Sequence, residues 1–169
     1  MSVFTNFIDF YENISRLKAV IGLDLGEKTI GVAVSNKLVS VASPLETIRR
    51  TKFKNDAAQL IKIIELRDIE GIVLGLPINM DGSEGPRCQS TRAFARNLNN
   101  LIEISISFWD ERLSTVAAER VLIEADTSRK RRNQVIDHVA AGYILQGALD
   151  RIQNIKAKER WMKFGNVKK

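Results

Sequence analysis

The sequence predicts an α/β fold with a mixed five-stranded sheet, in which three antiparallel strands are followed by parallel crossovers and helices flank the sheet. Two observations predict this class. The first is a pair of β-rich apolar runs, Val20–Leu25 and Ile30–Val34, joined by a short polar turn that begins at Gly26. The second is a change of period. From Asn55 onward, helical apolar spacing alternates with short apolar runs, as it does in β-α-β crossovers.

The elements are expected in the order βββ-α-β-α-β-α-α. Strands are expected in three consecutive segments and two later ones, at about 19–25, 29–36, 38–48, 70–75 and 103–109. Helices are expected between and after the later strands, at about 55–66, 86–100, from Ser114 or Thr115 onward, and 133–155. Pro44 interrupts the third strand, which suits an edge position because proline cannot donate to the ladder.

This order, with the first strand at the centre of the sheet, is the ribonuclease H-like arrangement. We expect the domain to span residues 19–155. An N-terminal lead-in, residues 1–18, precedes it and is expected to be helical or frayed. A basic C-terminal tail, residues 156–169, follows it.

The composition suits one globular domain. The chain has 169 residues, 44% of them hydrophobic, which is enough for a packed core. Cys88 is the only cysteine, so an intrachain disulfide and a cysteine-based zinc site are both excluded. The N-terminus lacks the pattern of a signal peptide, and no apolar run is long enough to cross a bilayer. We therefore expect a cytoplasmic protein with no membrane partner.

The net charge of +6 is concentrated in two places. Residues 151–169 contain seven Lys or Arg and one Glu, whereas the rest of the chain is neutral overall. A second basic focus comes before the last helix and consists of Arg129, Lys130, Arg131 and Arg132. Such segments on a neutral body indicate contact with a polyanion. The tail alone is explained equally well as a solvated segment, whereas the four-residue run favours nucleic acid.

Carboxylates stand at three sites that this topology brings together. Asp24 lies near the end of the first strand, Asp110 and Glu111 end the last strand, and Asp137 lies beside the apolar stripe of the long helix. The first and last strands run parallel, so their carboxyl ends meet at one edge. Taken singly, each acid also has a structural explanation, such as a hydrogen bond to a turn or a helix-start position. Together they indicate a site for Mg²⁺ or Mn²⁺, which prefer oxygen ligands and can activate water against a phosphodiester.

Three motifs resemble those of the YqgF family, also called RuvX. They are Ile21–Gly26 with Lys28–Ser35, then Gly75–Gly82, then Asp110–Thr115, and Asp137 follows in the last helix. The family is described as Holliday junction resolvase-like and as a pre-16S ribosomal RNA nuclease. The motifs stand in the right order over about 20–148, and the resemblance leaves out the lead-in and the basic tail.

The resemblance implies a ribonuclease H-like fold and metal-dependent phosphodiester hydrolysis, with Asp24, Glu111 and Asp137 as the acidic triad that holds Mg²⁺ or Mn²⁺. Either Asp110 or Glu111 can point inward, and we choose Glu111. The implied substrate is the 5′ end of precursor 16S ribosomal RNA, with the pre-ribosomal small subunit as partner and a monomer or homodimer as the active form. The residues then expected to contact nucleic acid are Lys28, Asn79, Arg112, Arg129, Lys130, Arg131 and Arg132.

Three alternatives remain at this point. The first is a Holliday junction resolvase-like nuclease acting on DNA, which would favour a dimer because the junction has two-fold symmetry. The second is a nucleic-acid-binding factor without catalysis, active in ribosome assembly or transcription. The third is an ATP-binding domain of the actin and sugar kinase type, whose opening hairpin is similar. The third is disfavoured because the chain is too short for two lobes.

Overall fold

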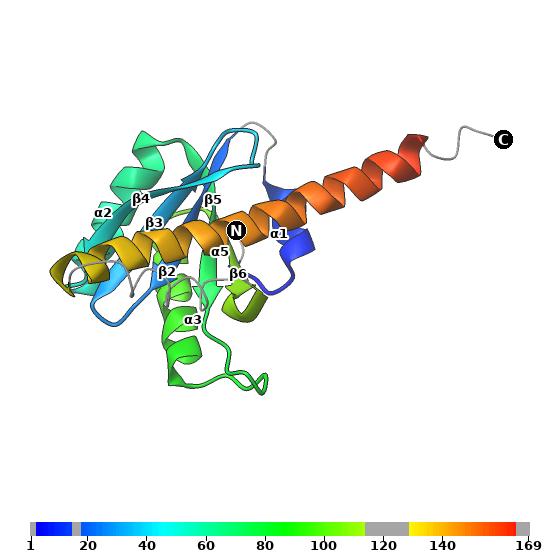
Figure 1. The fold of residues 1–169 in the computed structure, drawn as a ribbon. Helices are drawn as coiled ribbons and strands as arrows, with labels where there is room; N and C mark the ends of the chain where they lie inside the picture. Colours follow the sequence, from blue (N-terminus) through cyan, green and yellow to red (C-terminus); the bar gives the residue numbers. More distant parts are fainter. Residues whose placement is uncertain (1–2, 15–17, 114–128, 165–169) are drawn as a thin grey trace.

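The computed structural model describes residues 3–14, 18–113 and 129–164, and of residues 129–136 it describes the backbone alone. Within these residues the chain forms one mixed sheet with helices packed against it (Figure 1). The strands, in their order across the sheet, are β1 (Val3–Phe4), β6 (Ser105–Asp110), β5 (Ile69–Leu76), β2 (Ala19–Leu25), β3 (Thr29–Ser35) and β4 (Ala42–Arg49). The helices are α1 (Phe7–Asn13), α2 (Phe53–Leu66), α3 (Pro86–Asn99) and α5 (Arg129–Phe164), and a 3₁₀ turn, η1, covers Glu111–Leu113.

The predicted topology is confirmed around the central strand. Strand β2 pairs antiparallel with β3 and parallel with β5, and β5 pairs parallel with β6. Strand β4 forms one edge of the sheet, and its register shifts beside Pro44, as expected for a proline in an edge strand. The carboxyl ends of β2, β5 and β6 therefore reach the same edge of the sheet.

The sheet has six strands among the described residues, where the sequence predicted five. The additional strand is β1, which comes from the lead-in and pairs parallel with β6, with Val3 opposite Ile106. Two residues are too few to show the alternation by which a strand is recognised, so this pairing left no sequence signal. Helix α1 follows at once and places the fully buried ring of Phe10 against the sheet.

Two apolar cores lie on opposite faces of the sheet. Strand β2 is buried along its whole length, and its side chains alternate between the two cores. Ile21 and Leu23 pack with the core that contains α2 and α3, whereas Val20 packs with the core that contains α1 and α5. Helix α5 crosses the second face and contacts β2, β3, β4 and β5.

Helix α5 is longer than predicted at both ends. It begins at Arg129 rather than at Asn133, and it continues to Phe164 rather than ending near Ile155. The residues that extend it are mostly Lys, Arg, Glu, Ala and Met, which favour a helix even where little is buried. The helix predicted from Ser114 or Thr115 lies outside the described residues. In the part of the chain that the structure describes, none of the helices is long and apolar enough to cross a membrane.

Candidate active site

Asp24 carries the only carboxylate of the central strand β2, and the residue is buried, with 3% of its surface exposed. It lies two residues after Gly22, where an added Cβ would meet Leu145 of α5 at 2.6 Å. Residues two apart in a strand share a face. The side chain of Asp24 therefore points to the side of the sheet that α5 covers, close to the carboxyl end of β2.

Glycines stand on both sides of Asp24. In β3, Gly31 is its direct partner in the antiparallel ladder. In β5, Leu74 pairs with Leu23, so the next residue, Gly75, lies beside Asp24 on the other flank. The missing side chains leave space over both glycines, and groups from two other elements enter that space.

Helix α5 fills the space over Gly31. A Cβ added there would lie 1.9 Å from the carbonyl oxygen of Asp137 and 3.0 Å from the backbone nitrogen of His138. The carboxylate of Asp137 accepts a hydrogen bond of 2.5 Å from Thr29 Oγ1, at the start of β3. Next to it, Nδ1 of His138 lies 3.0 Å from Thr47 Oγ1 in β4. The backbone of α5 at Asp137 thus rests directly on the strand beside Asp24.

Glu111 fills the space over Gly75. A Cβ added to Gly75 would lie 2.7 Å from Glu111 Oε1. Glu111 follows β6 in η1 and stands two residues after Trp109, whose ring lies against Gly147 of α5. Glu111 therefore continues the face of β6 that α5 covers, and its carboxylate lies on the flank of Asp24 that is opposite to Asp137.

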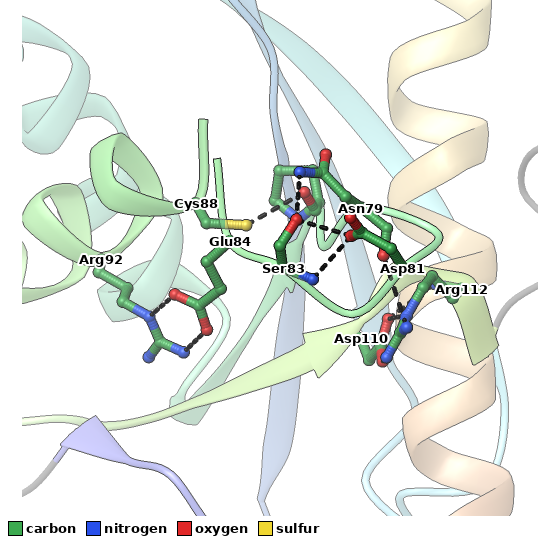
Figure 2. Close-up of polar contacts among 9 residues, drawn as sticks. Asn79, Asp81, Ser83, Glu84, Cys88, Arg92, Asp110 and Arg112 are labelled. Carbon is green, nitrogen blue, oxygen red and sulfur yellow. Dashed lines mark hydrogen bonds and ion pairs between the residues drawn. The ribbon is translucent and has the colours of Figure 1, made fainter. Parts of the chain in front are cut away.

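Asp110 is engaged elsewhere. Its carboxylate forms an ion pair with Arg112, in which Nη2 lies 2.7 Å from Oδ2 and Nε lies 3.0 Å from each oxygen (Figure 2). These hydrogen bonds lower the pKa of Asp110 and raise that of Arg112. Of the two acids that end β6, Glu111 is therefore the one beside Asp24.

At the edge of the sheet where β2, β5 and β6 end, Asp24, Glu111 and the backbone of Asp137 lie together, and we call this arrangement the rim. The carboxylate of Asp137 is turned toward Thr29. Among the described residues, no three His, Cys, Asp or Glu side chains are gathered closely enough to hold a metal ion. The donor type nevertheless fits a hard divalent cation, because all three acids offer carboxylate oxygens. A carboxylate buried as deeply as that of Asp24 is also expensive to keep ionised unless it is compensated.

The loop after β5 is tied to the end of β6. Asn79 Nδ2 donates to Ser83 Oγ at 2.9 Å, and the backbone nitrogen and hydroxyl of Ser83 both donate to Asp81 (Figure 2). These bonds lower the pKa of Asp81. Arg112 Nη1 lies 3.5 Å from the carbonyl oxygen of Asn79, so the two predicted nucleic-acid contacts are neighbours.

The other residues predicted to contact nucleic acid lie in the turn after β2 and at the start of α5. Lys28 is exposed in the turn between β2 and β3, next to the strand end that carries Asp24. The run Arg129–Arg132 forms the first turn of α5, and its side chains lie outside the described residues.

Sequence reasoning missed Gly31, Gly75 and Thr29 as parts of the site. The two glycines did carry a signal, because a glycine inside a strand often marks a place where another group approaches closely. Thr29 carried none, since its hydrogen bond to Asp137 joins residues 108 apart in the chain.

Comparison with known proteins finds one matching family model and several similar relatives. The model of the RuvX family, described as Holliday junction resolvase, matches residues 18–151. A protein of Ruegeria sp. (strain TM1040), named "Putative pre-16S rRNA nuclease", is 68% identical over 151 residues, which are 89% of this chain and 96% of that protein. A protein of the same name from Roseobacter denitrificans is 65% identical over 153 residues, covering 89% and 94% of the two chains.

Solved structures agree on the fold. RuvC of T. thermophilus, in complex with a Holliday junction substrate, matches with a TM-score of 0.51 and 11% identity, over 80% of this chain and 96% of that one. The yeast mitochondrial Holliday junction resolvase matches with a TM-score of 0.52 and 12% identity, over 93% and 88%. At these identities the likeness concerns the fold alone, and it confirms the predicted ribonuclease H-like arrangement.

Proposed function

Since the chain belongs to the RuvX family, we propose that it is a metal-dependent nuclease that hydrolyses RNA and processes the 5′ end of precursor 16S ribosomal RNA. The relatives from Ruegeria and Roseobacter, both named "Putative pre-16S rRNA nuclease", match 89% of this chain. The observation that carries the proposal is the rim itself. Buried Asp24 stands between Glu111, over Gly75, and the backbone of Asp137, over Gly31.

In this proposal Asp24, Glu111 and Asp137 hold Mg²⁺ or Mn²⁺. A cation bound there would supply an activated water and would offset charge on the leaving oxygen. The chain supplies position. The sheet fixes Asp24 from both sides, and Thr29 orients the carboxylate of Asp137 through its 2.5 Å hydrogen bond. Neither a histidine nor a cysteine nucleophile is required.

Basic side chains around the rim bind the phosphates of the substrate. Lys28 is exposed beside the strand end, and Arg129–Arg132 begin the helix that carries Asp137. Arg112 and Asn79 shape the loop next to Glu111, and the guanidinium of Arg112 is held in place by Asp110. Contacts of this kind give affinity that falls with salt and depends little on base sequence. The partner that presents this RNA is the pre-ribosomal small subunit, and trimming one RNA end requires only a monomer.

The test is cleavage of a precursor 16S RNA in the presence of Mg²⁺ or Mn²⁺. Asp24→Asn keeps the shape of the side chain and removes its charge. Because loss of a group that merely orients a metal ligand already costs about 10- to 100-fold, loss of a direct ligand is expected to lower cleavage by about 100-fold or more. Asp150→Asn is the matched control, because Asp150 is an exposed acid of α5. Equal cleavage by the wild type and Asp24→Asn would remove Asp24 from the chemistry.

A junction-resolving activity is the second candidate, favoured by the description of the matching family model. The same proteins are assayed on a four-way DNA junction of matched length. Faster cleavage of the junction than of the RNA would identify branched DNA as the substrate of the rim. Calorimetry with Mn²⁺ addresses the non-catalytic alternative, which predicts no binding that depends on Asp24, Glu111 and Asp137.

A further inference from the structure

Helix α5 continues well past the sheet that it packs against. Its inner part is anchored to the loop between β3 and β4, where Gln146 donates to Ser40 O at 3.0 Å and Gln153 donates to Val39 O at 2.8 Å. Ile152 is the last fully buried residue of this stripe, at 1% exposure. Beyond it the helix extends away from the body (Figure 1). We call residues 156–164 the arm.

The arm carries large apolar side chains that none of the described residues covers. Trp161 is 74% exposed, Phe164 is 71% exposed and Met162 is 64% exposed. A contiguous exposed apolar patch on a protein often marks a binding site. Trp161 and Phe164 are three residues apart, so they lie next to each other on the helix surface.

Helix geometry places the two rings away from the face that packs on the sheet. Successive residues turn by about 100°, so Trp161, nine residues after Ile152, lies on the opposite side of the helix. Phe164 lies beside it, one turn further on. The rings therefore do not continue the buried stripe, and they face away from the described part of the body while the helix stays straight.

The charge of the arm indicates which kind of partner binds these rings. Its basic residues outnumber its acidic ones by four to one: Lys156, Lys158, Arg160 and Lys163 against Glu159. On the helix surface, Lys158 and Arg160 flank the two rings, one on each side. A second copy of the arm would bring like charges together, whereas a polyanion with exposed π-faces complements both the rings and the cations.

We propose that the arm is a binding site for single-stranded RNA. Unpaired bases stack on Trp161 and Phe164 while Lys158 and Arg160 contact the adjoining phosphates, the combination by which proteins hold single strands without reading their sequence. The inference rests on the proposed function and extends it, because the arm would hold unpaired RNA outside the rim where cleavage occurs. A membrane surface is the less favoured occupant, since interfacial helices bury a broad apolar face rather than a pair of rings.

The experiment measures binding in a full-length chain that carries Asp24→Asn, so that cleavage does not interfere. The probe is a fluorescently labelled oligouridylate, followed by anisotropy, with an RNA duplex of equal length as the paired reference. Trp161→Ala is expected to weaken single-strand binding by about 5- to 150-fold, the range for loss of one stacked base, and to leave duplex binding unchanged. Lys158→Ala is expected to reduce the salt slope by about 0.7, the value for one phosphate contact to a single strand.

Met162→Ala is the matched control, because Met162 is a similarly exposed apolar residue on another side of the same helical turn. An equal loss in Met162→Ala, an equal loss of duplex binding, or unchanged single-strand binding in Trp161→Ala would overturn the proposal. Binding of the arm to phosphatidylglycerol vesicles that depends on Trp161, with no effect on RNA, would assign it to a membrane instead. The cleavage assay of Asp24→Asn is separate, so the nuclease and the arm can fail independently.

Discussion

Gly75→Ala tests whether the carboxylate of Glu111 must stand where the structure places it. The added Cβ would lie 2.7 Å from Glu111 Oε1 and 2.7 Å from Ile144 Cδ1, whereas ordinary van der Waals contact begins at 3.4 Å. Both atoms are ends of flexible side chains, so both can give way. The carboxylate must then move by the difference, about 0.7 Å, while the strand stays in place.

A shift of that size matters for catalysis more than for folding. Displacing a catalytic group by about 1 Å costs on the order of 100-fold in rate, so a 10- to 100-fold loss of RNA cleavage is expected for a movement of about 0.7 Å. Overpacking of a core costs roughly 1–3 kcal/mol of stability, and the lower end is expected here because the two contacting groups are flexible. The measurements are the cleavage rate at saturating Mg²⁺ and thermal unfolding.

Gly71→Ala supplies the matched control. Gly71 lies in the same strand and on the same face, and its added Cβ would meet Phe10 Cζ at 2.8 Å, far from Glu111. It therefore reproduces the overpacking without disturbing the rim. If both variants lose activity in proportion to their loss of stability, the position of Glu111 has no special role and the reasoning about the rim is refuted.

Three further predictions concern the same edge. Gly31→Ala is expected to lower the melting temperature sharply and abolish cleavage, because its Cβ would lie 1.9 Å from the backbone oxygen of Asp137; a stable, active variant would contradict this placement of α5. Thr29→Val is expected to reduce cleavage about 10-fold, as loss of an orienting partner does, with a raised requirement for Mn²⁺ in a metal titration. Arg112 lowers the pKa of Asp110, so this pair stabilises the fold above the ordinary pKa of the carboxyl, 3.8, and the contribution disappears as the pH falls through the lowered value. Between pH 5 and about pH 2, the melting temperature should therefore fall less steeply for Asp110→Asn than for the wild type.

Periodicity was enough to predict the central part of the fold. The runs around Asp24 and the later crossovers specify strands β2, β3, β5 and β6 because each buries apolar side chains at regular intervals. Strand β1 could not be predicted, because its two residues gain their structure from pairing with β6. The C-terminal extent of α5 was underestimated because residues 156–164 are mostly exposed and so show no apolar stripe in the sequence.

The sequence alone does not determine whether Asp110 or Glu111 faces Asp24. The two residues are adjacent, and a slip of one residue at the end of β6 exchanges the faces on which they stand. Register is set by pairing across strands, here Leu76 with Asp110, and by the ion pair that draws Asp110 toward Arg112. Neither can be derived from the order of residues.

In the proposed site, two glycines let parts of other elements approach Asp24 closely. A carboxylate in the middle of a sheet has a neighbouring residue in each adjacent strand. Side chains on those two residues would keep other elements away from the carboxylate. With Gly31 and Gly75 in those positions, the backbone of α5 and the carboxylate of Glu111 approach Asp24 from its two sides. Substitutions at these glycines should therefore affect catalysis through different routes. At Gly31 the contact is rigid backbone, so the helix itself must move, whereas at Gly75 it is a side-chain end, so activity can be lost while the fold survives.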